Sequence, residues 1–95
     1  MRLRYTRRAV AELDEALSFI ERQSPKGALS VKERIQEVIA LLLQHPHAGP
    51  LTNKSRLRRI VAYPYPYLIF YQATETEIVI HGAGHGSRRR FSQSG

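Results

Sequence analysis

An apolar stripe at helical spacing, within residues 28–42, constrains the fold of this chain more than any other feature. Its members recur mostly three or four positions apart, as on one face of an α-helix, and they are Ala28, Val31, Ile35, Val38, Ile39 and Leu42. A second stripe precedes it and consists of Val10, Leu13, Leu17 and Ile20. Ser24 and Pro25 lie between the stripes and suit the N-cap and first turn of a helix. Together the stripes predict a helical hairpin whose apolar faces need a further layer to cover them.

Four segments with β-type patterns supply that layer, and they are residues 1–6, 57–63, 67–73 and 78–81. In the first, Leu3 and Tyr5 alternate with arginines, so one face is apolar and the other cationic. Residues 67–73 are apolar on both faces, which predicts a central strand. Residues 63–66 cannot form one, because two prolines there remove two ladder donors. The expected fold is α+β in the order β-α-α-β-β-β, with the helical hairpin packed on a small antiparallel sheet.

The length and composition indicate one domain, residues 1–95, in which residues 91–95 are expected to form a frayed tail. The chain contains no cysteine, so it offers no disulfide framework or thiolate zinc site, and we expect a reducing, cytoplasmic location. The longest wholly apolar run, from Val38 to Leu43, is much shorter than the roughly 20 residues that span a bilayer. No membrane partner is expected.

The net charge of +7 is concentrated toward the two ends of the chain. Residues 1–8 hold four basic side chains and no acidic ones, residues 9–46 hold four and six, and residues 47–95 hold seven and two. The three parts therefore carry +4, −2 and +5. Clustering of this kind favours a polyanionic partner, either nucleic acid or an acidic protein. Charge that serves solubility alone is the alternative.

The four histidines form two close pairs, and neither pair predicts a metal site. His45 and His47 flank a proline at the end of a predicted helix. His81 is expected at the end of the last strand, and His85 in a glycine-rich loop after it. A zinc site needs three or four ligands, and the sequence offers no third ligand for either pair. We expect no metal and no other cofactor.

Glycine occurs at every second position from Gly82 through Gly84 to Gly86, a pattern similar to that of phosphate-binding loops. The spacing differs from the dinucleotide-binding fingerprint, and too few residues follow to build the second half of such a fold. These glycines are expected instead to end the last strand, or to expose backbone N–H groups and allow another backbone to come close.

The largest group of chemically capable side chains is cationic and accompanies one histidine; it comprises His85, Lys54, Arg56, Arg58, Arg59, Arg88, Arg89 and Arg90. RNA cleavage without a metal needs a base, an acid, and cations that stabilise the charge on the phosphorane. His85 would be catalytic in that case, but no second proton-transfer group follows it. The residues alone favour a surface whose lysine and arginines bind a target, with catalysis as the alternative.

Short motifs spread along the chain carry a resemblance to a known family. They are Tyr5-Thr6-x-x-Ala9 with Leu13-Asp14-Glu15, Pro25-x-x-Ala28, His45-Pro46-x-x-Gly49, Leu57-Arg58-Arg59, Tyr67-Leu68-Ile69-Phe70-Tyr71 and His85-Gly86-x-Arg88-Arg89. In this order they resemble the RelE/ParE superfamily of toxins from bacterial type II toxin–antitoxin systems, from Arg4 to Arg90. The resemblance implies a compact toxin in a hetero-oligomer with a cognate antitoxin, which wraps an amphipathic, partly acidic segment around it.

The branches of this superfamily differ in activity: ParE-like members inhibit DNA gyrase, and RelE-like members cleave mRNA on the ribosome. The long paired helices and the ending from His85 to Arg89 resemble the ParE branch, and the tyrosine that many RelE-like ribonucleases carry near the C-terminus is absent. Gly82 and Gly84 stand where relatives carry bulkier or basic residues. The expected function is therefore a gyrase-inhibiting toxin. The alternatives are a metal-independent RelE-like endoribonuclease, with phosphates held by Arg58, Arg59 and Arg88, and an inactive or purely binding protein.

Overall fold

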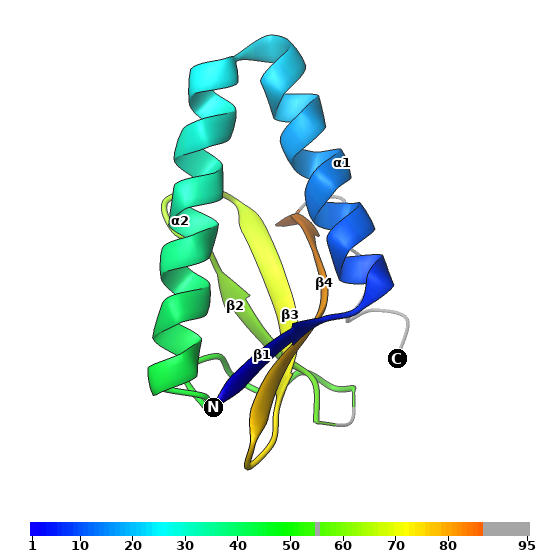
Figure 1. Cartoon of the computed structure of the whole chain (residues 1–95), viewed down its shortest axis with the longest axis vertical. Helices are drawn as coiled ribbons and strands as arrows, with labels where there is room; N and C mark the ends of the chain where they lie inside the picture. Colours follow the sequence, from blue (N-terminus) through cyan, green and yellow to red (C-terminus); the bar gives the residue numbers. More distant parts are fainter. Residues whose placement is uncertain (55, 87–95) are drawn as a thin grey trace.

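The computed structural model describes residues 1–54 and 56–86 of the 95-residue chain. Within these residues, two helices and four strands follow one another in the predicted order (Figure 1). They are β1 (Arg2–Tyr5), α1 (Arg7–Gln23), α2 (Pro25–Gln44), β2 (Arg58–Val61), β3 (Tyr67–Ala73) and β4 (Glu77–His85). The prediction of a frayed tail at residues 91–95 lies outside the described residues.

Hydroxyl side chains begin both helices, and the one that begins the second helix is the predicted Ser24. Thr6 Oγ1 accepts the N–H of Ala9 at 3.0 Å, and Ser24 Oγ accepts the N–H of Gly27 at 3.0 Å. Each bond satisfies one of the donors that the first turn of a helix leaves without a partner. Pro25 occupies the first turn of α2, where its missing N–H costs nothing. The hairpin therefore turns at the one residue, Ser24, that ends α1 and caps α2.

The strands lie in the order β1-β4-β3-β2. β2, β3 and β4 form the predicted antiparallel meander, and β3 is central, as its two apolar faces indicate. β1 pairs with β4 in parallel, so the sheet is mixed where a wholly antiparallel one was expected. A strand of four residues carries no local signal for the direction of its partner, and here the helical hairpin and the meander together set that direction.

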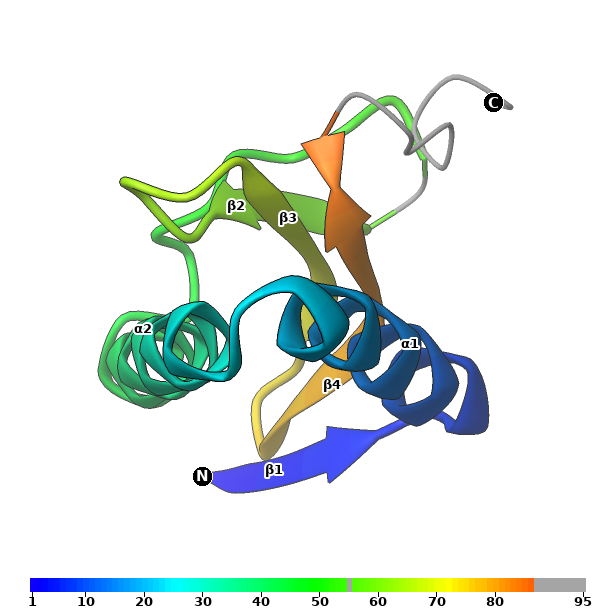
Figure 2. The ribbon, with the colours of Figure 1, turned by 90° about the horizontal axis from the view of Figure 1, so that it is seen from above.

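One face of the sheet and the facing sides of both helices form the core (Figures 1 and 2). Its buried members include Val31, Ile35, Val38, Ile39 and Leu42 from α2, Ala9 from α1, and Ile69, Tyr71, Ile78 and Ile80 from the sheet. The predicted stripe of α2 is thus the apolar face that the sheet covers. Leu13, Leu17 and Ile20 of the predicted α1 stripe pack at the edge of the same core, whereas Val10 is exposed.

The last strand is longer than predicted, because β4 continues through Gly82 and Gly84 to His85. The prediction that these glycines end the strand and place His85 in a loop was wrong. Gly82 pairs with Phe70, and Gly84 pairs with Leu68. Large side chains of β3 therefore lie opposite residues that have none, and the glycines leave room for them on that face of the sheet.

Candidate functional site

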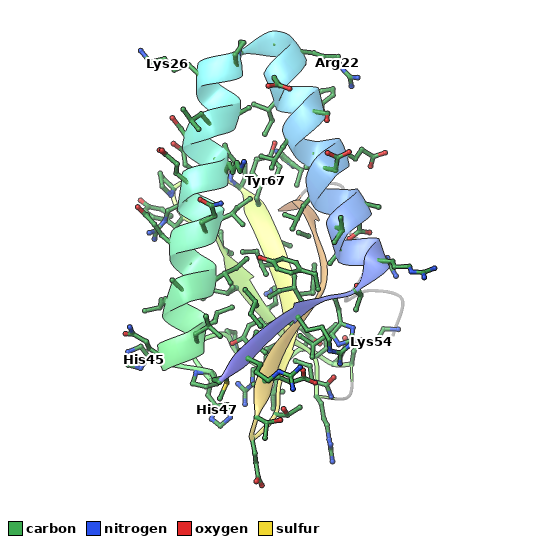
Figure 3. All side chains as sticks on the ribbon, viewed as in Figure 1. Arg22, Lys26, His45, His47, Lys54 and Tyr67 are labelled. Atoms are coloured by element: carbon green, nitrogen blue, oxygen red, sulfur yellow. The ribbon has the colours of Figure 1, made fainter. Side chains whose placement is uncertain are left out.

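His85 lies at the end of β4 and faces the helices. It pairs across the ladder with Tyr67, and the two rings meet edge to face with their centroids 5.4 Å apart. Tyr67 packs against the core, and in the view of Figure 3 it is seen through the gap between the two helices. Because side chains that pair across a ladder project from the same face, His85 lies on the covered side of the sheet. Its ring is partly buried there.

Arg58 lies at the start of β2, and its side chain bonds within the fold. Its Nη1 donates to the carbonyl oxygen of Gly49 at 2.8 Å. Across the ladder it pairs with Tyr71, at the opposite end of β3 from the partner of His85. The two partners are four residues apart, about 13 Å along a strand. Arg59 is exposed and projects from the other face, because successive strand residues alternate.

The other predicted target-binding residues divide between a loop and the end of the chain. Lys54 and Arg56 lie in the loop before β2, where Arg56 is exposed and has a φ of 59°. Arg88, Arg89 and Arg90 lie outside the described residues. In the part of the chain that the structure describes, Arg58 and Arg59 are therefore separated from His85, and the predicted set for RNA cleavage does not assemble there.

The hydroxyl of Tyr71 holds the turn that follows α2. It donates to the carbonyl oxygen of Pro46 at 2.9 Å and accepts the N–H of Gly49 at 2.9 Å. Burial raises the pKa of Tyr71 above its ordinary value, while the bond from Gly49 and the charge of Arg58 oppose that rise. The ring of Tyr71 is fully buried. This turn, Arg58 and β3 are consequently one hydrogen-bonded unit.

His81 is the histidine on the side of the sheet away from the helices. The ladder shifts register between Phe70 and Tyr71, and His81 falls at that irregularity. Its Nε2 lies 3.3 Å from Oε1 of Gln72. Burial lowers the pKa of His81, and the nearby charge of Arg4 lowers it further. His81 is therefore held toward its neutral form next to a cation.

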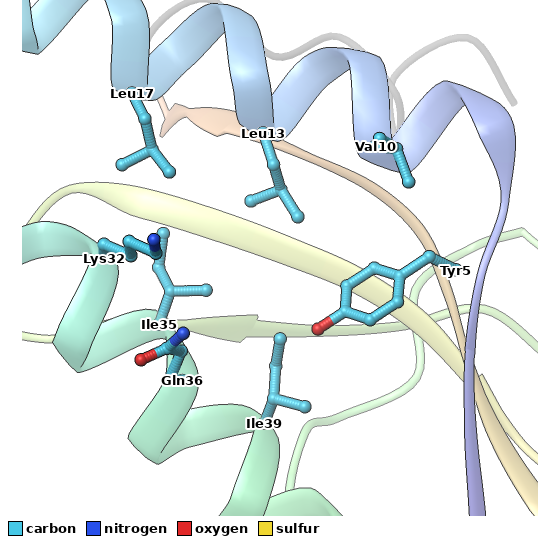
Figure 4. Close-up of a pocket in the computed structure, with 8 residues that line it drawn as sticks. All are labelled: Tyr5, Val10, Leu13, Leu17, Lys32, Ile35, Gln36 and Ile39. Carbon is cyan, nitrogen blue, oxygen red and sulfur yellow. The ribbon is translucent and has the colours of Figure 1, made fainter.

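An open apolar groove of about 230 Å³ lies between the two helices and β1 (Figure 4). It is lined by Tyr5, Val10, Leu13, Leu17, Lys32, Ile35, Gln36 and Ile39. The ring of Tyr5 extends from β1 toward α2, and burial raises the pKa of its hydroxyl. Lys32 and Gln36 add polar groups on the α2 side of the groove. Such a groove suits apolar side chains of a partner that also carries acidic groups.

Among residues 1–54 and 56–86, no three His, Asp or Glu side chains come together as metal ligands would. His45 and His47 lie at the end of α2, and His81 and His85 both lie in β4. Neither described helix combines the length and apolarity that crossing a bilayer requires.

The family model for the ParE toxin of the type II toxin–antitoxin system parDE matches residues 3–90 of this chain. The chain belongs to the ParE toxin family. The candidate toxin Y4kP of Sinorhizobium fredii is 34% identical over 71 residues, which cover 75% of this chain and 74% of that protein. A chain of the chromosomal ParDE toxin–antitoxin system of P. aeruginosa has the same fold, with a TM-score of 0.74, 24% identity, and coverage of 90% of this chain and 95% of that one.

The ParE motifs have structural roles that their positions in the sequence did not reveal. Gly49, Arg58 and Tyr71 belong to three separate motifs, yet they meet in the turn after α2. Sequence reasoning assigned Arg58 to target binding, and the fold uses its guanidinium to hold that turn. Only the register between β2 and β3 brings these motifs together, so no pattern within any one of them could have shown it.

Glu12 of α1 is a residue of this ParE-family toxin that sequence reasoning missed. Its Oε1 accepts the N–H of Ala83 in β4 at 2.9 Å, and its Oε2 accepts from Arg8 Nε at 3.0 Å. β1 pairs with β4 only as far as Ile80, and beyond that point α1 lies against β4. The carboxylate therefore bonds an edge N–H that none of the described strands reaches. In the sequence, Glu12 looked like one of several solvent-facing acids of the first helix.

Proposed function

We propose that this ParE-type toxin inhibits DNA gyrase in the cytoplasm and that a cognate antitoxin neutralises it in a hetero-oligomer. The observation that carries the proposal is the match of residues 3–90 to the ParE family, taken with the separation of Arg58 from His85 in the sheet. The family match supports the toxin role, and the separation favours a toxin that binds its target over one that cleaves RNA.

The geometry around His85 argues against the ribonuclease alternative. An RNA-cleaving site needs a proton-transfer group and cations close to one phosphate. His85 lies against Tyr67 on the helix side of the sheet, whereas Arg58 is bonded to Gly49 at the other end of β3. Exposed cations such as Arg59 remain available to a negatively charged target.

A supercoiling assay with purified DNA gyrase, run beside a ribosome-dependent mRNA cleavage assay, tests the proposal. We expect micromolar toxin to inhibit supercoiling and to leave mRNA intact. An Arg59→Gln variant should inhibit less well if the exposed cations contact the target. Lys26→Gln is the matched control, because it removes the same charge from the tip of the helical hairpin (Figure 3).

Unchanged supercoiling together with mRNA cleavage would replace the gyrase proposal with the RelE-like alternative. If the protein shows neither activity, the remaining alternative is a protein that only binds its partner. Neutralisation is measured in the same supercoiling assay, by adding an antitoxin and following the return of gyrase activity. An antitoxin that binds without restoring supercoiling would contradict neutralisation.

A further inference from the structure

The face of the sheet that points away from the helices carries buried apolar side chains of its own. Phe70 lies between Ile69 and Tyr71, which belong to the core under the helices, so its side chain projects from the opposite face. Val79 of β4 alternates in the same way. Phe70 is 0% exposed, Val79 is 3% exposed, and Leu57, immediately before β2, is 7% exposed. None of these three residues belongs to the core under the helices, and we call them the outer cluster.

No helix or strand among residues 1–54 and 56–86 lies over the outer cluster. Both helices pack on the other face of the sheet (Figure 2). The loop that precedes β2 contributes Leu57, but Leu51 of the same loop is 59% exposed. A sheet face can be left to water where it carries polar residues, whereas a ring without exposed surface needs neighbours on every side. A cover for Phe70 therefore has to come from another segment.

The part of β4 opposite Phe70 leaves room for such a cover. Gly82 pairs with Phe70, and Gly84 pairs with Leu68, whose side chain also projects from the outer face. Because neither glycine has a side chain, another segment can come close to the backbone of β4 beside these two residues. Gly82 is itself buried, as a covered position would be.

The described part of the chain leaves the sheet next to this face. The N–H of Gly86 donates to the carbonyl oxygen of Pro66 at 2.7 Å. A Cβ built on Gly86 would lie 3.8 Å from Cγ of Leu68. Residues 87–95 therefore begin beside an apolar side chain of the outer face.

Phe91 is the one large apolar residue that follows Gly86. It lies five positions further along the chain, and five extended residues span up to about 17 Å. Phe70 lies two positions beyond Leu68 in β3, about 7 Å along the strand. The ring of Phe91 can consequently reach Phe70 with chain to spare. A segment of the same chain also covers this face without the entropy that association with a second molecule would cost.

We propose that residues 87–95 fold back over the outer face of the sheet, with the ring of Phe91 on Phe70. Arg59 pairs with Phe70 across the ladder and is exposed on that face. The docked segment therefore holds the arginines at positions 88–90 close to Arg59, and the four guanidinium groups form one cationic surface. The position of the segment is independent of the proposed function, whereas the use of this surface to bind the target rests on it.

Contacts of the Phe91 ring in the whole toxin test the position of the segment directly. The measurement is the nuclear Overhauser effect from its ring protons to the ring of Phe70 and to the methyl groups of Leu68. We expect both signals. Their absence, or signals from Phe91 to the helix-facing side of the sheet, would overturn the proposal. Signals that arise only between labelled and unlabelled molecules in a mixed sample would replace the segment with that of a second copy.

Thermal unfolding tests whether the Phe91 ring is buried. Phe91→Ala removes most of the ring, so we expect the Tm to fall by about 5–10 °C. Phe91→Leu keeps an apolar side chain and should lower the Tm less. Gln93→Ala, a change to a polar residue of the same segment, is the control and should leave the Tm unchanged. A Phe91→Ala toxin as stable as the unchanged protein would show that the ring lies in water and would overturn the proposal.

Gyrase inhibition tests whether docking presents the arginines to the target. Phe91→Ala keeps every arginine and the net charge of +7. We expect it to need about three- to tenfold more protein for equal inhibition, because its arginines are no longer held in place before binding. Gln93→Ala should inhibit normally. Full inhibition by Phe91→Ala would reject the role of docking in target binding. Docking signals in a toxin that leaves gyrase active reject the proposed target alone, and inhibition without those signals rejects this inference alone.

Discussion

Gly49 shows how one residue holds two distant parts of this toxin together. Its N–H donates to the hydroxyl of Tyr71, and its carbonyl oxygen accepts from Arg58. A Cβ at this position would lie 2.7 Å from the carbonyl oxygen of Arg59 and 3.0 Å from the ring and hydroxyl of Tyr71. Steric exclusion by backbone and a buried ring, and not an unusual backbone angle, is thus what requires glycine here.

Gly49→Ala is expected to destabilise the fold by about 1–3 kcal/mol, because neither the β2 backbone nor the buried tyrosine can move freely. Urea unfolding measures the change. Gly86→Ala is the matched control, since its added Cβ would meet its nearest neighbours at 3.4 to 3.9 Å, which is ordinary contact. Equal stability of the two variants would show that the turn relaxes around the added methyl group.

Tyr71→Phe is expected to cost about 1–3 kcal/mol, because it leaves the N–H of Gly49 and the carbonyl oxygen of Pro46 without their partner. Tyr67→Phe, in the same strand and also packed against the core, should cost less, because the described fold records only a ring contact there. Urea unfolding of both variants at neutral pH gives the comparison. A larger loss for Tyr67→Phe would contradict the assigned hydroxyl network.

The stability of the fold at alkaline pH provides a further test of the burial of Tyr71. Burial raises the pKa of Tyr71 in the folded state above 10.0, so the unfolded chain loses that proton first. The contribution of the raised pKa of Tyr71 to the free energy of unfolding is complete below about pH 10 and falls as the pH rises beyond it. The decline in unfolding free energy between about pH 9 and 11 should therefore be shallower in Tyr71→Phe. A part of the decline remains, because burial also raises the pKa of Tyr5.

At the scale of elements, the joint between α1 and β4 depends on polar bonds as well as on apolar packing. Thr6 caps α1 and also donates its hydroxyl to the carbonyl oxygen of His81 at 3.3 Å. One turn and a half further on, Glu12 accepts the N–H of Ala83. The helix thus takes over the edge of β4 at the point where β1 ends.

Glu12→Ala is expected to destabilise the toxin by about 1–2 kcal/mol and to accelerate amide exchange at Ala83, because a charged acceptor is lost from a strand edge. Glu15→Ala is the control, an exposed acid of the same helix. NMR exchange of both variants reports the local effect, and urea unfolding reports the global one. Unchanged protection of Ala83 would show that packing of α1 alone holds this edge.

At the scale of the whole molecule, the positive charge is concentrated toward the two ends of the chain. Four arginines fall on β1 and the start of α1, and three follow β4 at positions 88, 89 and 90. The helical hairpin between them carries the acidic excess. We expect the C-terminal arginines to contribute to binding a negatively charged target.

Replacing Arg88, Arg89 and Arg90 together by glutamine lowers the net charge from +7 to +4. We expect the variant to lose most of its gyrase inhibition, because arginines attract a negatively charged target before contact and so accelerate its association. Replacing Arg22 and Lys26 by glutamine at the hairpin tip, which lowers the net charge from +7 to +5, is the control for charge removed elsewhere (Figure 3). Supercoiling assays and thermal unfolding are compared for both. Full inhibition by the triple variant would exclude the C-terminal arginines from target binding.

His85→Ala distinguishes the two activities that the superfamily offers. In a gyrase-binding toxin, the change removes a ring contact with Tyr67 and should cost about 1 kcal/mol of stability while inhibition persists. In a ribonuclease, the same change would abolish activity without affecting antitoxin binding. His45→Ala, at an exposed histidine beyond α2, is the control. Loss of toxicity in folded His85→Ala toxin would argue for a catalytic role.

The sequence alone determined the elements of this protein, their order and the family. Helix stripes, the cap at Ser24, and the strand alternation of residues 67–73 are set by neighbours in the chain, so local patterns reveal them. The strand alternation also assigned Leu3 and Tyr5 to one face and Arg2 and Arg4 to the other, as β1 shows.

Only the tertiary structure decided which residues meet. The parallel pairing of β1, the continuation of β4 through Gly82 and Gly84, and the bond from Glu12 to Ala83 all join residues at least ten positions apart. The register between strands separates His85 from Arg58. The positions of these residues in the sequence could not show that separation. The physical reason is that a contact between distant residues depends on how whole elements pack, and each local segment is compatible with several such arrangements.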